Sequence, residues 1–250
     1  MTRAAAASAR RLPLAAAGTR ARLSFYPPGL RQAAHSHQRA HVSIIIAGTV
    51  REVSGTRDEI GFPSTLTVRP YEITHHVEFG PQGALILSVD VDDAISTRPN
   101  GWNHCNLSAA QRTLLSWVLA QGGAREADAD ECIRDLMASI EREHFHGSPP
   151  SWLIRARERL TSEPDVRIDE LARAAGVHRA HFARAFQHWF KAPPSLFRGR
   201  ALLCRALAEL ASGQSLAAAA CNAGFADQSH LSRSMRATFG VTPRRLLRRA

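Results

Sequence analysis

Lysine is nearly absent from this chain of 250 residues: Lys191 is the only one, and arginine supplies the rest of the 32 basic side chains. Cysteine is also scarce, and the four cysteines at positions 105, 132, 204 and 221 form no C-x-x-C pair. This spacing argues against a disulfide framework or a thiolate zinc site and favours free thiols in a cytoplasmic protein. A P-loop, a nucleophile elbow and a dinucleotide-binding fingerprint are all missing, which argues against the corresponding enzyme classes.

Long apolar runs are missing as well. No segment approaches the ~20 apolar residues that span a bilayer, so we expect no membrane partner. The Ala- and Arg-rich start, residues 1–22, weakly resembles a targeting leader, but its apolar part is short and contains Pro13. We therefore predict a disordered tail there. The remaining length fits one large or two ordinary domains, and a hydrophobic content of 44% is enough for real cores.

Positive charge is concentrated in the C-terminal part of the chain. Residues 150–250 contain 17 Arg or Lys against 7 Asp or Glu, whereas residues 1–149 contain 15 of each kind. The whole net charge of +10 therefore lies after residue 149, as a binding surface for a polyanion requires. A GC-rich genome would explain arginine in place of lysine but not this asymmetry.

One sequence pattern occurs twice in the basic part, at residues 168–190 and 215–239. Each copy has a short Ala/Leu helix, a turn near a glycine and a longer helix with a polar start. Ala172 and Gly176 of the first copy recur 48 residues later in the second. A tight turn between steeply crossing helices favours glycine, so both copies are predicted helix-turn-helix units.

The second helix of each unit, here called the recognition helix, has an apolar face and a polar face. The polar face offers cations, amides and small side chains, which suit phosphates and base edges in a DNA major groove. For each such residue the alternative is a solvated helix face, and His181 also has the alternatives of capping or packing. Asp227 is predicted to start its helix rather than to contact bases. The predicted DNA contacts are Arg179, His181, Arg184, Gln228, Ser229, Arg233 and Arg236.

The duplicated unit, with G-F-A-D-Q-S-H-L-S-R-S-M followed by G-V-T-P at Gly240–Pro243, resembles the AraC/XylS family of bacterial transcription regulators. The resemblance covers about the last hundred residues. It implies an all-α DNA-binding domain at residues 148–250, with a joining helix at 195–211 between the units. It also implies that the two recognition helices enter successive major-groove segments roughly 34 Å apart.

Three positions depart from the family pattern. His178 stands where a serine usually caps the first recognition helix, Lys191 where a glycine usually follows it, and Leu202 where an arginine is common in the joining helix. A weak cap costs about 1 kcal/mol. We therefore expect the first unit to be less well ordered, or less sequence-specific, than the second.

Residues 23–105 contain short β-branched runs bounded by glycine, proline and polar residues, which is typical of a small sandwich or barrel. The spacing His35-x-His37, then His41, and later Pro70-x-x-x-x-His75 is similar to the two motifs of the cupin family. This resemblance implies a cupin-like sensor barrel. The chain departs from the motifs in that His41 occupies the usual Glu position, a Glu at 72 replaces a glycine, and a Phe at 79 replaces a later ligand.

Two interpretations of these histidines stay open. Residues i and i+2 of a strand share a face, so His35 and His37 converge, and His41 and His75 would complete a site for a divalent transition metal. Alternatively the pocket holds no metal, and a histidine hydrogen-bonds a small-molecule effector or the backbone. Trp102 either closes this pocket or anchors a loop on the core.

Residues 106–147 return to a helical period and predict a helical hairpin, which serves either as a lid on the barrel or as a dimer contact. Gly147-Ser-Pro-Pro then breaks the chain and is the expected interdomain linker. The predicted fold class is therefore α+β with two domains: a cupin-like β-barrel with a helical hairpin, and an all-α domain with two helix-turn-helix motifs.

We interpret the protein as a cytoplasmic, sequence-specific transcription regulator and not as an enzyme. Its expected partners are double-stranded DNA and a small-molecule or metal effector, with RNA polymerase and a second copy of the chain as further candidates. The alternative is a metal-dependent cupin enzyme, or a metal sensor, fused to a DNA-binding domain. No carboxylate accompanies the histidines as a clear general base, which argues against the enzyme.

Overall fold

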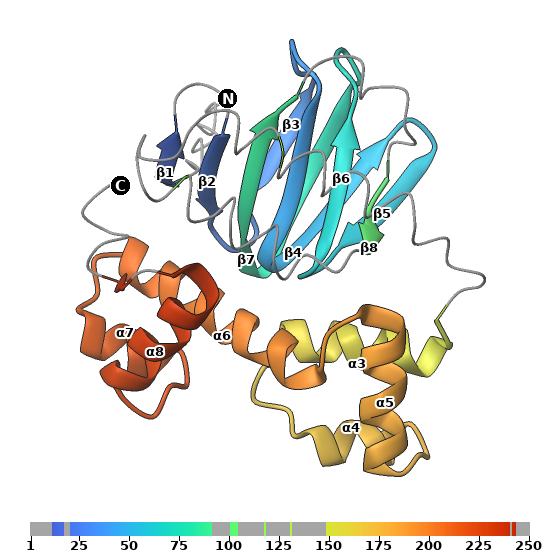
Figure 1. The fold of residues 1–250 in the computed structure, drawn as a ribbon, viewed down its shortest axis with the longest axis vertical. Helices are drawn as coiled ribbons and strands as arrows, with labels where there is room; N and C mark the ends of the chain where they lie inside the picture. Colours follow the sequence, from blue (N-terminus) through green and yellow to red (C-terminus); the bar gives the residue numbers. More distant parts are fainter. Residues whose placement is uncertain are drawn as a thin grey trace, which may run out of the picture.

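The structure is a computed structural model that describes residues 12–17, 21–91, 101–104, 118, 131, 149–240 and 242–243. A curved antiparallel sheet lies above a layer of helices in the view of Figure 1. The described strands end by residue 104 and the helices of the second domain begin at residue 151, so the α+β, two-domain fold class is confirmed. The helical hairpin predicted at 106–147 lies outside the described residues, apart from single helical positions at 118 and 131.

The sheet runs in the order β1-β2-β7-β4-β6-β8, with β3 beside β7 and β5 beside β4, and all described pairings are antiparallel. The β-branched runs of the sequence form strands, as predicted, but β4 and β7 are long, with 14 and 16 residues. The strands are β1 (Leu12–Ala17), β2 (Ala21–Tyr26), β3 (Arg31–His35), β4 (His41–Ser54), β5 (Arg57–Gly61), β6 (Thr65–Arg69), β7 (His75–Asp90) and β8 (Asn103–His104).

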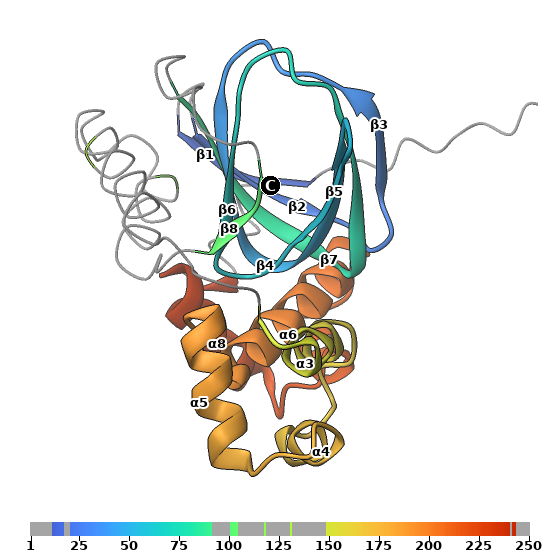
Figure 2. The same ribbon diagram turned by 90° about the vertical axis from the view of Figure 1, so that its right-hand side faces the viewer.

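The two long strands, β4 and β7, give the sheet its barrel-like curvature. Each changes partner along its length: β4 pairs first with β6 and later with β5, and β7 pairs first with β3 and later with β2. Bulges flank Gly48, which has φ of 80°, and a Cβ there would lie 2.0 Å from the carbonyl oxygen of Gly83. The strands curve around an interior (Figure 2), but β1 and β8, the ends of the described path, do not pair with each other.

The chain before β2 differs from the sequence prediction. A disordered tail is predicted over residues 1–22, but Leu12–Ala17 form β1, which pairs with β2 through a register that ends at Ala17 and Ala21. Pro13 is accommodated because β1 is an edge strand of the described sheet and its register shifts after this residue. The partner strand is itself held by β7, far along the chain, so a local composition argument misses the pairing.

Six described helices form the second domain, and none of the described helices is both long and apolar enough to cross a membrane. α4–α5 and α7–α8 are the two helix-turn-helix units, and α6 joins them. The helices are α3 (Ser151–Ser162), α4 (Ile168–Ala174), α5 (Arg179–Phe190), α6 (Pro194–Ala211), α7 (Leu216–Asn222) and α8 (Gln228–Phe239).

Both recognition helices, α5 and α8, begin at a side-chain cap. Asp227 accepts a hydrogen bond from the backbone N–H of His230 at 2.6 Å, which confirms the predicted helix-starting role. His178 caps α5 as well, because its Nδ1 accepts the backbone N–H of Ala180 at 3.2 Å. The imidazole therefore caps α5 in place of the serine that is usual at this position.

Hydrophobic cores join the two domains as well as the helices. Three phenylalanines of α5, at 182, 186 and 190, pack with α3, with Phe197 of α6 and with Phe62 of the barrel. A second cluster combines apolar residues of β2, β4 and β7 with α6, α7 and α8. Leu202, which departs from the family pattern, is buried in this second cluster.

Candidate DNA-binding surface and sensor pocket

Each recognition helix buries one side and exposes the other. Phe182, Phe186 and Phe190 of α5 are buried at spacings of four residues, as are Leu231, Met235 and Phe239 of α8. This spacing keeps three side chains on one helix face and leaves the remaining faces to solvent. All seven side chains predicted to contact DNA are exposed: Arg179, His181 and Arg184 on α5, and Gln228, Ser229, Arg233 and Arg236 on α8.

The two polar faces differ in how their charges are engaged. On α5, Nη1 of Arg179 lies 3.2 Å from Oδ1 of Asp169 in α4. On α8, neither Arg233 nor Arg236 forms an ion pair with any described residue. The positive charge of α8 is therefore less compensated inside the protein than that of α5 and is available to a phosphate or a guanine.

A cavity of about 240 Å³ lies inside the barrel. Its wall combines imidazoles, hydroxyls and two arginines with an apolar side on which the Tyr26 and Phe79 rings stack at 4.2 Å. Phe79, which stands at a usual ligand position of the cupin motif, thus supplies apolar wall. The lining residues are Arg22, Tyr26, Gln32, His35, His37, His41, Ser43, Val50, Arg69, His75, Val77, Phe79, Ile86 and Ser88.

Three of the four predicted histidines form one group at this cavity. His35 of β3 and His75 of β7 are paired in the strand register, and His37 follows two residues after His35. One ligand nitrogen from each ring lies within 4.8 Å of the others. The pairing of β3 with β7 therefore brings His35 and His75 together, and His37, which lies just after the end of β3, completes the predicted convergence.

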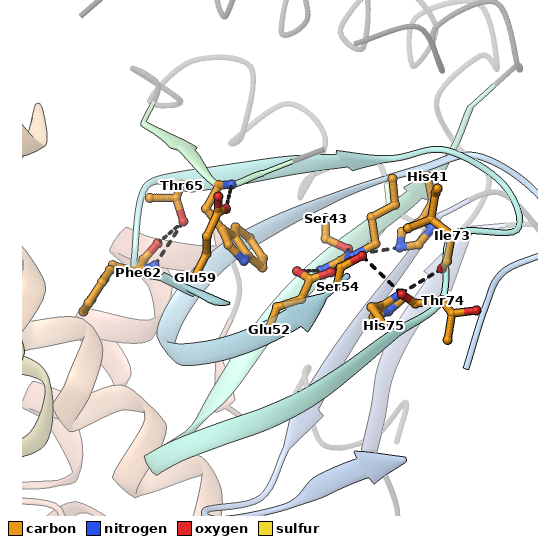
Figure 3. Close-up of polar contacts among 12 residues, drawn as sticks. His41, Ser43, Glu52, Ser54, Glu59, Phe62, Thr65, Ile73, Thr74 and His75 are labelled. Atoms are coloured by element: carbon orange, nitrogen blue, oxygen red, sulfur yellow. Dashed lines mark hydrogen bonds and ion pairs between the residues drawn. The ribbon is translucent and has the colours of Figure 1, made fainter. Parts of the chain in front are cut away.

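Backbone carbonyls fix two of these rings. His35 Nδ1 lies 2.8 Å from the carbonyl oxygen of Ala33, and His75 Nδ1 lies 3.2 Å from that of Ile73 (Figure 3 shows the latter). A carbonyl can only accept, so Nδ1 carries the hydrogen and Nε2 presents its lone pair in each ring. This is the arrangement that prepares a histidine to bind a metal.

Burial lowers the pKa of two of these imidazoles, His37 and His75. Desolvation, with the neighbouring His75 and His35, lowers the pKa of His37 to about 4. Desolvation, followed by the charge of Arg69, lowers the pKa of His75 to about 4. At neutral pH His37 and His75 are therefore neutral. Together with His35 they offer three nitrogens, a set that fits a divalent transition metal such as zinc, copper or nickel.

His41 takes a different role from the one predicted for it. Its Nε2 lies 3.2 Å from Nη1 of Arg69, and the same Nη1 donates to Ser43 Oγ at 3.0 Å. The other two nitrogens of this guanidinium, Nε and Nη2, pair with Glu52 (Figure 3). Burial and the charge of Arg69 hold the pKa of His41 well below its usual range. Because the cation donates to Nε2, this nitrogen is not available to a metal bound by the other three histidines.

The sequence interpretation missed Arg69, which lines the cavity, and Glu52, its buried partner. Strand alternation in β6 places Arg69 on the same face as Thr65 and Thr67, which could have indicated that it points into the barrel. A single polar residue at a strand end is, however, also typical of an exposed edge. The pair neutralises itself, and Arg22 lies 3.5 Å from Asp90. The cavity therefore offers hydrogen bonds and neutral nitrogen donors rather than an uncompensated charge.

Two further positions near the cavity can be compared with expectation. Trp102 does not line the cavity: its backbone N–H donates to Glu59 at 3.0 Å and its ring lies 5.4 Å from the Arg69 guanidinium. It thus anchors the β8 segment on the barrel, which was one of the two predicted roles. Glu72, which replaces a glycine of the cupin motif, has φ of 63°, a left-handed conformation that favours glycine.

Residues 171–249 match the family model of a helix-turn-helix domain. With the two units described above, this match identifies residues 171–249 as a helix-turn-helix domain, as the sequence predicts. A helix-turn-helix domain is a DNA-binding module, and here it follows a curved antiparallel sheet that encloses a cavity. A search of curated protein sequences returned no match.

Several solved structures resemble the chain at low sequence identity. ToxT from Vibrio cholerae O395 aligns over 92% of this chain and 97% of its own, with 9% identity and a TM-score of 0.38. The AraC-like transcriptional activator CuxR aligns over 76% and 77%, with 13% identity and a TM-score of 0.38. A mutant of the oxalate decarboxylase OxdC from Bacillus subtilis aligns over 32% of this chain, with 19% identity and a TM-score of 0.27, and the chain spans 22% of that enzyme.

Proposed function

We propose that the protein recognises a specific DNA sequence through α5 and α8 together, and that the barrel cavity binds the effector that regulates this recognition. The observation that supports the DNA-binding part is the pair of exposed polar helix faces within a matched helix-turn-helix domain. The same domain holds the whole net positive charge of the chain. Two faces on one rigid domain suit two neighbouring major-groove segments.

The residues divide by chemistry into two roles. Gln228, Ser229 and Arg233 lie in the first half of α8 and are proposed to contact base edges, for which an amide, a hydroxyl and a guanidinium are the usual partners. Arg236 lies one turn further and is proposed to bind phosphate, which sets affinity rather than sequence choice. On α5, base contacts are proposed for Arg179, His181 and Arg184. RNA polymerase and a second copy of the chain stay predictions from the family resemblance.

The DNA-binding proposal is tested by selecting duplexes from a random pool with the full-length protein. The selected duplex should bind about a thousandfold or more tighter than unrelated duplex at the same salt concentration. Affinity for unrelated duplex should fall steeply with salt, because it comes from released counterions. Equal affinity for selected and unrelated duplexes would instead identify a nonspecific, architectural DNA-binding protein.

A metal effector is the second proposal, and the group of His35, His37 and His75 favours it. The three imidazole nitrogens would hold a divalent transition metal, and the metal would cross-link β3 and the segment after it to β7. His41 and Arg69 would then polarise the wall beside the site without binding the metal. A small organic molecule that hydrogen-bonds the same imidazoles is the alternative effector, and catalysis would require a general base that this wall does not supply from Glu52, which is engaged by Arg69.

Metal analysis of the purified full-length protein separates these effectors. Replacement of His35 and His37 together by alanine should remove a stoichiometric transition metal that the native protein retains. The matched control is His76→Ala, because His76 is exposed on the opposite face of the same strand. Absence of metal from the native protein, combined with thermal stabilisation by an organic molecule that the double variant loses, would replace the metal by an organic effector.

A further inference from the structure

The turn between β5 and β6 joins the barrel to the first helix-turn-helix unit. Phe62 in this turn is fully buried, although it belongs to the barrel. Its side chain packs in the cluster that holds Leu153 and Leu160 of α3 and the phenylalanines of α5. A barrel side chain thus forms part of the core on which the first recognition helix rests.

Two arginines of the helical domain reach the same turn. The Arg157 guanidinium of α3 lies 3.4 Å from the centre of the Phe62 ring, and Arg200 of α6 donates to Ser64 Oγ at 3.0 Å. Burial lowers the pKa of both guanidinium groups to about 10, and neither forms an ion pair with a described carboxylate. A buried cation without a carboxylate weakens the contact that contains it. The turn is therefore held by its packing, with Phe62 as the main apolar group.

A second contact connects the barrel to the joining helix. Arg205 of α6 donates to the Gln82 side chain of β7 at 3.1 Å, and Gln82 donates to the carbonyl oxygen of Ser162 in α3 at 3.0 Å. The Cys204 thiol of α6 is fully buried beside the backbone of Leu85, and burial raises its pKa to about 12. α6 continues from this contact into the second unit, where it packs on α7 and α8. Figure 1 shows α6 running beneath the sheet between the two units.

We infer that the barrel is a splint that fixes the two helix-turn-helix units relative to each other, with the Phe62 turn holding the first unit and β7 holding the joining helix. This inference rests on the proposed function, since it concerns how that DNA binding is regulated. Two recognition helices on one duplex must meet the major groove at a fixed separation. The splint therefore sets the spacing between half-sites that the protein accepts.

One short strand connects the cavity wall to the turn that contacts the first unit. β6 begins at Thr65, directly after the Phe62–Ser64 turn, and ends at Arg69 in the cavity wall. An effector that contacts Arg69 would therefore contact one end of β6, a strand of five residues, and the Phe62–Ser64 turn lies at the other end of that strand. Ser64 has φ of 69°, so this end of the strand holds a backbone conformation that serine adopts rarely.

The native cysteines report whether the splint is in place. Cys204 is buried where α6 meets β7, and Cys221 is exposed on the second unit. A maleimide should label Cys221 at once and Cys204 only when the barrel lifts from α6, and mass spectrometry of the peptides distinguishes the two. The second measurement is affinity for the selected duplex and for the same duplex with a few base pairs inserted between its half-sites.

Three full-length variants test the splint. Phe62→Ala removes its main apolar contact and should raise the labelling rate of Cys204 by about tenfold or more, with a similar loss of discrimination between the two duplexes. Arg200→Met replaces a buried cation by an apolar side chain of similar length, so Cys204 should be labelled more slowly and discrimination should be kept. Ile60→Ala, at an exposed position on β5, is the matched control and should change neither measurement.

Faster labelling of Phe62→Ala with unchanged discrimination would overturn the inference, because the barrel would then touch the units without setting their spacing. Unchanged labelling would overturn it as well, since Phe62 would not hold the interface. If Phe62→Ala fails to fold, as circular dichroism would show, Arg200→Met still tests the splint from the opposite direction: faster labelling of Cys204 in that variant contradicts it. Failure of the native protein to prefer its selected duplex over random DNA is a separate outcome, which removes the proposed function and the splint together.

Discussion

The two helix-turn-helix units of this protein have the same plan and use different residues to build it. Both recognition helices bury side chains at i, i+4 and i+8, but α5 uses three phenylalanines, whereas α8 uses Leu231, Met235 and Phe239. The first helices are offset by 48 residues and the recognition helices by 49, so the second unit has one more residue in its turn. The spacing of buried positions thus defines the motif, and the identity of the buried side chains is free to vary.

The units also differ at the ends of their recognition helices and in their surroundings. α5 begins at an imidazole and ends at Lys191, which has φ of 52°, whereas α8 begins at a carboxylate and ends at Gly240, with φ of 72°. Barrel side chains enter the core of both units: Phe62 of the β5–β6 turn packs with the first, and apolar residues of β2, β4 and β7 share a cluster with the second. The first unit thus has weaker local signals at its helix ends than the second, although the barrel packs against both units.

Removal of the last buried phenylalanine from each recognition helix should have the largest effect. Phe190→Ala and Phe239→Ala each leave a cavity at a fully buried position, and each should lower the free energy of unfolding by about 3–5 kcal/mol. Hydrogen exchange should show that each variant first loses amide protection in its own unit. If Phe190→Ala loosened α7 and α8 as much as α4 and α5, the two units would form one cooperative element and the comparison would fail.

Truncation of matched arginines should distinguish the two DNA-binding faces. Arg233→Ala should weaken binding to the selected duplex by about 1–3 kcal/mol and binding to random duplex much less. Arg184→Ala, at the matched position 49 residues earlier, should cost less, because Ala180 and Ala183 surround it where α8 has Ser229 and Ser232. Fluorescence anisotropy with both duplexes measures the difference. Equal losses of Arg233→Ala on selected and random DNA would show that this side chain binds phosphate only.

Removal of the helix N-caps should lower stability by a smaller amount. Asp227→Ala should lower the free energy of unfolding by about 1 kcal/mol, because it removes both a hydrogen bond of 2.6 Å and a negative charge at a helix N-terminus. His178→Ala removes a longer hydrogen bond and no negative charge, so about 0.5 kcal/mol is expected. Urea denaturation of both variants measures these losses. A larger loss for His178→Ala would reverse the ranking of the two caps.

The smallest effects are expected where the recognition helices end. Lys191→Gly should stabilise the protein by about 0.5 kcal/mol, because glycine adopts the left-handed conformation without the steric cost of a side chain but loses more entropy on folding. Gly240→Ala should destabilise it by about 1 kcal/mol for the converse reason. Thermal denaturation of the Lys191→Gly and Gly240→Ala variants measures these two changes in stability. Destabilisation by Lys191→Gly would mean that contacts of the lysine outweigh its backbone strain.

Local patterns were sufficient to predict the helical domain. The periodicity of apolar residues, the glycine turns and Asp227 as a cap all act within a few residues, and each appears in the structure where the sequence places it. The clustering of His35, His37 and His75 was predictable for a related reason, since strand alternation and the spacing of two short motifs place these residues on one wall.

Pairings between distant segments were not predictable in this way. Leu12–Ala17 form β1 only because β2 offers an edge, and Nε2 of His41 is unavailable to a metal only because Arg69 reaches it from β6. Similarly, nothing in the local sequence of Phe62 assigns it to the core of another domain. The sequence by itself determined the two recognition helices, their charge and a histidine-lined strand pair, because these depend on periodicity along the chain. Only the tertiary structure decided which histidines group together and how the barrel contacts both units, because those contacts depend on which distant surfaces bury each other.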